Sequence, residues 1–299
     1  MKQMLLGSLL SSLLFFTACQ PAADDGLQQL QQELEELIAG QPGTIAVAFR
    51  DVNRPDVQVL INEKEVFHAA STMKTPVMVE LYKKAAAGVL AMEDSVLIVN
   101  EFYSIVDSSR YSMELGEDSE EKLYGLIGQK ATVYDLTYDM IIYSSNLATN
   151  ILIGLADAKA VTQTMRDMGA NDIQVLRGVE DGKAFRQGLN NTTTAYDLML
   201  LFEQLGKRTA VNPEADEAMI RILMDQKFND AIPALLPKEV KVAHKTGWIT
   251  RVRHDSGLVV LPDGRQYALV ILTKDWESDE ATTQVMAQIS KAVYDYFSK

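Results

Sequence analysis

The strand-forming segments of this chain occur near its two ends, and helical segments fill the stretch between them. Near the N-terminus, residues 45–52 and 57–61 are apolar and β-branched and flank a turn, which predicts a hairpin. Strand patterns return at 240–243 and beyond residue 249, where two apolar runs flank a Pro-Asp-Gly turn at 262–264. We therefore expect an α+β fold in which both ends of the chain contribute to one antiparallel sheet.

Apolar residues recur at helical spacing in the middle of the chain and at both termini. Amphipathic helices at 27–37 and 279–297 are expected to flank the sheet. The pattern predicts an α/β lobe from about 26–70 and 206–299, with an inserted all-helical lobe at about 71–205. An active site would lie in the cleft between the two lobes. The helices expected in the middle cover 71–90, 133–143, 146–156, 161–168 and 194–205.

Three short motifs follow one another along the chain. Ser71 precedes Lys74 by one helical turn, so that the amine can take the proton of the hydroxyl. The second motif, Ser-Ser-Asn at 144–146, offers a hydroxyl and a side-chain amide, and the third, Lys-Thr-Gly at 245–247, offers a cation, a hydroxyl and a glycine. Each motif alone is common on solvated surfaces. Together they predict a serine nucleophile with a lysine base, located at the start of a helix where the dipole favours negative charge.

The ordered motifs Ser-x-x-Lys, Ser-x-Asn and Lys-Thr-Gly resemble those of the penicillin-recognising serine hydrolases, and their spacing is similar to that of class A β-lactamases. The resemblance covers about 27–299. It implies a β-lactamase/transpeptidase-like fold and hydrolysis of a small-molecule β-lactam through an acyl-serine intermediate, without a cofactor or metal. Two alternatives would use the same residues: a D-alanyl-D-alanine peptidase or other small-amide hydrolase, and an envelope protein that penicillin acylates without turnover.

The resemblance also implies catalytic roles for individual residues. Ser71 would attack the carbonyl, Lys74 would act as the base, and Ser144 would pass a proton to the departing nitrogen. The backbone amides of Ser71 and Trp248 would stabilise the oxyanion.

The same resemblance implies a set of substrate contacts. Asn146 would bind the amide of the substrate's side chain, while Lys245 and Thr246 would hold its carboxylate. Gly247 would let the substrate lie close to the strand. His254 stands where the family often has a carboxylate-binding arginine, so we expect it to contribute to the same subsite. Arg251 and Arg253 are close by and are the alternatives for that role.

The sequence departs from the class A pattern at further places. Ser145 replaces an aspartate of the middle motif, and Trp248 is bulkier than the residues usual after Lys-Thr-Gly. The stretch 100–129 is longer than expected and is predicted to lie near the cleft rim. The loop pattern Glu-x-x-Leu-Asn is absent; in the corresponding segment, 177–191, Glu180 is the best candidate for the base that activates the deacylating water. The alternative is that Glu180 is a solvated loop carboxylate.

The N-terminal residues predict export. A basic start and an apolar run too short to span a bilayer end at the only cysteine of the chain, Cys19. This pattern resembles a bacterial lipobox and predicts a signal peptide at 1–18, a single catalytic domain at 19–299, and a periplasmic or cell-envelope lipoprotein anchored to the membrane through acylated Cys19. An ordinary signal peptide is the alternative. A single cysteine excludes an intramolecular disulfide or a cysteine metal cluster.

The charge balance and the remaining motifs narrow the function further. The chain has 28 basic and 41 acidic residues, which argues against nucleic acid as a partner. No phosphate-binding glycine loop or His-Glu-x-x-His zinc motif is present. A Ser-His-Asp triad could involve His68, His244 or His254, but the contexts of His68 and His244 favour packing or hydrogen-bonding roles. We expect a monomer without cofactor or metal.

Overall fold

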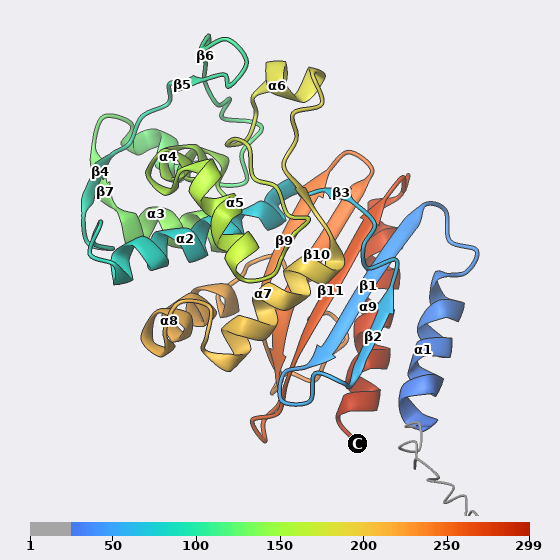
Figure 1. Ribbon diagram of the computed structural model, residues 1–299. Coiled ribbons are helices and arrows are strands. Elements are labelled where there is room, and N and C mark those ends of the chain that lie inside the picture. Colours follow the sequence, from blue (N-terminus) through green and yellow to red (C-terminus); the bar gives the residue numbers. More distant parts are fainter. Residues whose placement is uncertain (1–24) are drawn as a thin grey trace, which may run out of the picture.

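The computed structural model describes residues 25–299, so the predicted signal peptide and Cys19 lie outside the described residues (Figure 1). A five-stranded antiparallel sheet of order β2-β1-β11-β10-β9 forms the centre of one lobe. Because its strands come from both ends of the chain, the expected α+β class is confirmed. The strands are β1 (Thr44–Asp51), β2 (Gln58–Ile61), β9 (Lys241–Ile249), β10 (Val252–Val260) and β11 (Gln266–Lys274).

Helices cover both faces of this sheet (Figure 1). The terminal helices α1 (Asp25–Ile38) and α9 (Asp279–Phe297) pack together on one face, as the sequence predicts, and α7 (Ala195–Lys207) packs on β1, β10 and β11 from the other. Side chains of β1 alternate between the two cores, because successive residues of a strand point to opposite faces. Ile45 belongs to the core under α1 and α9, and Ala46 belongs to the core shared with the helical lobe.

The helical lobe is built around α2, which packs against α3, α4, α5 and α8. Most helices of the lobe begin at a side-chain cap that satisfies a free backbone amide, such as Thr132 before α3 and Ser145 before α4. Among residues 25–299, no helix is both long and apolar enough to cross a bilayer. The helices are α2 (Lys74–Ala86), α3 (Val133–Ile142), α4 (Asn146–Ala156), α5 (Ala158–Asp167), α6 (Gly182–Arg186) and α8 (Pro213–Met224).

Three details of the fold differ from the expectations drawn from the sequence. β9 continues without a break from Lys241 to Ile249, because it pairs with β10 along its whole length. Helix α8 was not expected, although Asn212 caps it and Pro213 opens it. Helix α7 lies within the range assigned to the helical lobe, yet it packs on the sheet because its apolar face meets β11.

Short strand pairs and two 3-10 turns complete the lobes, and η1 and β3 border the cleft. The turn η1 (Ala70–Met73) leads from β3 into α2, and η2 (Lys122–Leu126) lies within the long segment 100–129. That segment runs beside α6 at the top of the helical lobe in Figure 1. The short pairs are β3 (Phe67–His68) with β8 (Thr192–Thr193), β4 (Ser95–Leu97) with β7 (Lys130–Thr132), and β5 (Phe102–Tyr103) with β6 (Arg110–Tyr111).

Candidate active site

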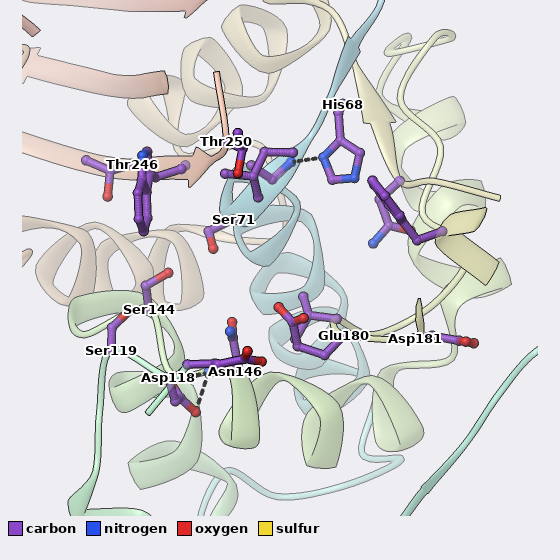
Figure 2. A pocket seen from close by; sticks show the side chains of 18 of the residues that line it. His68, Ser71, Asp118, Ser119, Ser144, Asn146, Glu180, Asp181, Thr246 and Thr250 are labelled. Atoms are coloured by element: carbon purple, nitrogen blue, oxygen red, sulfur yellow. Dashed lines mark hydrogen bonds between the residues drawn. The ribbon is translucent and has the colours of Figure 1, made fainter. Parts of the chain in front are cut away.

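A cleft of about 880 Å³ lies between the two lobes and contains residues of all three motifs. Ser71 lies in η1 on its floor, where the chain enters α2. Figure 2 shows the Ser71 hydroxyl directed toward the space between Ser144 and Glu180. The cleft is also lined by Asn146, Thr246, Gly247 and Trp248, from the second and third motifs.

The amine of Lys74 is buried beneath this cleft and is held by acceptors of the second motif. Its Nζ donates to the Ser144 carbonyl at 2.7 Å, to Ser144 Oγ at 3.2 Å and to Asn146 Oδ1 at 2.9 Å. Within the described residues no hydrogen bond joins this amine to the Ser71 hydroxyl. Burial lowers the pKa of Lys74 to about 7, although the negative charges of Asp118 and Glu180 oppose that shift.

Two lysine amines meet at the Ser144 hydroxyl. Lys245 Nζ donates to Ser144 Oγ at 3.1 Å, opposite the bond from Lys74, and also to the Thr246 carbonyl at 2.9 Å. Burial and the neighbouring Lys74 charge lower the pKa of Lys245, while Asp255 opposes the shift. Ser144 has a left-handed backbone with φ 60°. The hydroxyl therefore lies on a short hydrogen-bonded path between two buried amines whose pKa values are both lowered.

Strand β9 forms an edge of the sheet and borders the cleft. At Gly247 an added Cβ would lie 3.2 Å from the Ser71 nitrogen, so a side chain here would push the strand away from η1. The next residue, Trp248, is 60% exposed at the rim, and its indole nitrogen donates to Asp279 at 2.9 Å. The close approach therefore places Gly247, the residue before Trp248, against the backbone of Ser71.

The loop 177–191 is held at its two ends by side chains. Asn191 Oδ1 accepts from the backbone nitrogens of Leu176 and Arg177, and its amide donates to the Arg177 carbonyl. Farther along, Asn150 of α4 accepts from the Val179 nitrogen at 2.7 Å and donates to the Val179 carbonyl at 3.0 Å. Gly178 makes this clamp possible, since a Cβ there would overlap Asn150 Oδ1.

Glu180 follows this clamp and lines the cleft. Its backbone is left-handed, with φ 60°, and Figure 2 shows the side chain directed toward the space between Ser71 and Asn146. Burial and the neighbouring Glu117 raise the pKa of Glu180, whereas Arg177 and Lys74 oppose the shift. The structure thus places a carboxylate with perturbed affinity for protons beside the candidate nucleophile.

His254 does not lie where the sequence led us to expect it. Its ring is 1% exposed and packs edge-on against Phe67, and both nitrogens are occupied by the backbone, Nδ1 by the Thr273 amide and Nε2 near the His68 carbonyl. Burial lowers the pKa of His254 to about 4, so the ring is neutral at pH 7. It offers nothing to a substrate carboxylate. Its neighbour Arg253, on the opposite side of β10, lines the cleft instead.

The other histidines also have structural surroundings. His244 of β9 is 1% exposed and its Nδ1 lies 2.9 Å from Asp255 Oδ1, while His68 lines the cleft and its Nδ1 accepts from the Ala70 amide at 3.0 Å. Within residues 25–299, no group of His, Cys, Asp and Glu side chains is arranged to hold a metal ion.

Sequence reasoning missed Asp118 and Asn150. Asp118 lines the cleft from the long segment 100–129, and its carboxylate accepts from the Asn146 and Leu147 backbone nitrogens (Figure 2). No local pattern identifies Asp118, because its partners lie 28 and 29 residues away. Asn150 lies one helical turn after Asn146 and was detectable as a polar residue on an otherwise apolar helix.

A family model described as the β-lactamase enzyme family matches residues 29–297 of this chain. The chain belongs to this family. Within the β-lactamase family, it is 23% identical over 296 residues to the extended-spectrum β-lactamase PER-1 of Pseudomonas aeruginosa, covering 94% of this chain and 91% of that protein. It is 28% identical to a β-lactamase of Bacteroides uniformis over 55% of this chain and 60% of that protein.

Solved structures of β-lactamases and related proteins share the fold. PBP-A is 25% identical, with a TM-score of 0.78 over 91% of this chain and 97% of PBP-A, and a variant of PBP-A is described as an acyl-enzyme complex with penicillin G. The TLA-1 extended-spectrum β-lactamase is 19% identical, with a TM-score of 0.79 over 92% of this chain and 100% of TLA-1. These similarities confirm the β-lactamase/transpeptidase-like fold.

Proposed function

We propose that this protein is a serine β-lactamase that opens the amide of a β-lactam ring through an acyl intermediate on Ser71. The proposal rests on a buried cluster of three side chains, in which the Ser144 hydroxyl accepts hydrogen bonds from both the Lys74 and the Lys245 amines. Membership of the β-lactamase family and the similarity to PER-1 support the same substrate class.

In the acylation step, Lys74 as the neutral amine takes the proton of Ser71 while the hydroxyl attacks the carbonyl. The lowered pKa of Lys74, about 7, makes a substantial neutral fraction available at physiological pH. The backbone amides of Ser71 and Trp248 stabilise the oxyanion, a contribution typically of about 10² in rate for one donor. The Lys74 ammonium then donates a proton to Ser144 Oγ along the existing hydrogen bond, and Ser144 gives its own hydroxyl proton to the departing nitrogen.

The substrate lies along β9. Asn146 binds the side-chain amide of the substrate, and Lys245 with Thr246 binds its carboxylate beside Gly247. Arg253 supplies a second cation at that end of the cleft, the role that the sequence assigned to His254. The ion pair of Arg253 with Asp230 positions the guanidinium there.

Deacylation requires a base for water, and Glu180 is the candidate. Its carboxylate lies beside the cleft, and burial raises its affinity for protons toward the range suited to a general base. A protein that is acylated without turnover is the competing function. The similarity to PBP-A, one variant of which is described as a penicillin G acyl-enzyme, favours that alternative if Glu180 is inactive.

The test is nitrocefin turnover combined with mass spectrometry of the purified protein. Wild type should hydrolyse nitrocefin repeatedly, and Ser71→Ala should neither turn over nor gain the mass of the β-lactam. Glu180→Gln should be acylated at Ser71 but show a burst followed by little turnover. Labelling that persists in Ser71→Ala would refute the nucleophile. A wild type that stops after one equivalent would assign the non-turnover function, and equal turnover by Glu180→Gln would remove the deacylation role from this residue.

We further propose that the mature protein is an exported, monomeric lipoprotein anchored to the envelope membrane through Cys19. The proposal rests on the apolar run that ends at this single cysteine. Cys19→Ser should convert a membrane-bound acylated form into a form without lipid. Wild-type protein recovered unacylated from the soluble periplasmic fraction of its native host would contradict the anchor.

A further inference from the structure

A carboxylate from the long segment 100–129 contacts the helix that carries the second motif. Asp118 Oδ1 and Oδ2 accept from the Asn146 nitrogen at 2.9 and 3.0 Å, and Oδ2 also accepts from the Leu147 nitrogen at 2.8 Å. These are free amides of the first turn of α4, where a negative charge is favoured by the helix dipole. Figure 2 shows the Asp118 side chain directed at Asn146. The start of α4 is thus capped by a residue distant in sequence.

The segment around Asp118 is built to hold this carboxylate in place. Tyr124 OH donates to Asp118 Oδ2 at 3.1 Å, and the Glu120 nitrogen lies 3.3 Å from Oδ1. Glu120 is 6% exposed and caps the following turn by accepting from the Leu123 nitrogen. Leu123 itself is buried in the core of the helical lobe. Asp118 therefore does not move freely at the cleft rim.

The contact of Asp118 with Asn146 leads directly to the lysine base. Asn146 donates its backbone amide to Asp118 and receives the Lys74 amine on its side-chain oxygen at 2.9 Å. Three charged groups from different elements influence Lys74: Asp118 from the long segment, Glu180 from the loop 177–191, and Lys245 from β9. Of the two carboxylates, Asp118 is the stronger influence and favours the ammonium form of Lys74.

We propose that Asp118 is a positioning residue of this active site, which fixes the start of α4 and the Asn146 side chain and holds a negative charge toward Lys74. The inference rests on the proposed function, in which neutral Lys74 is the acylation base. It gives a role to the long segment. It also accounts for the middle motif, where Ser145 caps α4 through the Ala148 nitrogen and leaves the Asn146 and Leu147 amides for another acceptor.

The experiment measures the acylation rate of full-length protein from pH 5.5 to 9, by rapid quench and mass spectrometry of Ser71. Asp118→Asn keeps the shape and one acceptor oxygen but loses the charge that stabilises the ammonium, so the inflection of its pH profile should move lower by about 0.5–1 unit. The acylation rate at pH 6, divided by the plateau rate of the same protein, should then be about three- to fivefold larger for Asp118→Asn than for wild type. Asp118→Ala should show the same shift and also a lower plateau, because two helix amides lose their acceptor.

Glu121→Gln is the matched control, since Glu121 is an exposed acid of the same segment and its side chain does not cap η2. It should keep the wild-type inflection. An unchanged inflection in Asp118→Asn, or an equal shift in Glu121→Gln, would overturn the proposal. If Asp118→Ala does not fold, Asp118→Asn alone decides. A wild type that is not labelled at Ser71 would instead refute the proposed function. A labelled wild type whose acylation rate does not depend on pH would refute neutral Lys74 as the base, and this inference with it.

Discussion

The burial of Lys74 makes a quantitative prediction for the pH dependence of acylation. The free lysine pKa of 10.5 is lowered to about 7 because the amine is fully buried beneath the cleft. Only the neutral amine can accept the Ser71 proton, so the rate should rise with pH and reach half its maximum near pH 7. With that pKa, about one eleventh of the molecules are neutral at pH 6 and about ten elevenths at pH 8, so the rate should rise about tenfold between these values.

An unburied lysine would behave differently. With a pKa of 10.5, only about 0.3% of the amine would be neutral at pH 8, and the rate would still rise about tenfold per unit above that pH. The assay is rapid mixing with nitrocefin and measurement of the acylation burst. Lys74→Ala should slow this burst by about 10² or more. Lys84→Ala, which removes a lysine from the same helix outside the cleft, should leave the rate unchanged.

A plateau above pH 8 with an inflection near 7 would agree with this reasoning. A rate that still increases tenfold from pH 8 to 9 would refute it, because burial would then not have produced a neutral base. A burst of normal size in Lys74→Ala would show that another group takes the proton. In that case Lys245, which also contacts the Ser144 hydroxyl, becomes the base to test.

Two further predictions concern the walls of the cleft. Gly178→Ala should displace the Asn150 side chain, destabilise the protein by about 1–3 kcal/mol and slow deacylation while Ser71 is still acylated. The control in thermal melts and nitrocefin assays is Gly154→Ala, which lies in open space on the same helix as Asn150. Equal effects of the two substitutions would refute the clamp. Arg253→Ala should raise the nitrocefin KM by up to about tenfold, whereas Arg251→Ala, outside the cleft, should not; equal KM values for the two variants would remove Arg253 from carboxylate binding.

The parts of this molecule that could be predicted from the sequence are those that depend on neighbours along the chain. Ser71 and Lys74 lie one turn apart at the start of a helix, and this spacing alone brings hydroxyl and amine to one side. The order of strands and helices likewise predicts which layers can form. Neither the spacing of Ser71 and Lys74 nor the order of the layers depends on the angle between the two lobes. Both can therefore be predicted from the sequence.

The role expected for His254 shows where such reasoning ends. Successive residues of a strand point to opposite sides, so His254 and Arg253 on β10 cannot both face the cleft. Pairing with β11 directs the His254 ring toward Phe67 and leaves Arg253 on the cleft side. A one-residue difference in facing reverses the assignment, because the sequence places a basic residue type on each face of the strand, Arg253 on one and His254 on the other.

Glu180 depends on a tertiary contact that no local pattern contains. Asn150 binds both backbone groups of Val179, and the next residue turns into a left-handed conformation, with φ 60°, that costs a residue with a side chain roughly 1–2 kcal/mol. Such strain persists only where surrounding contacts determine the backbone, and it occurs preferentially at functional sites. The turn directs the Glu180 carboxylate into the cleft, even though this residue is displaced by one position from the family pattern. The clamp by Asn150 is therefore the physical reason to test Glu180 as the base, ahead of Asp181, whose carboxylate is already occupied by the Ala184 amide.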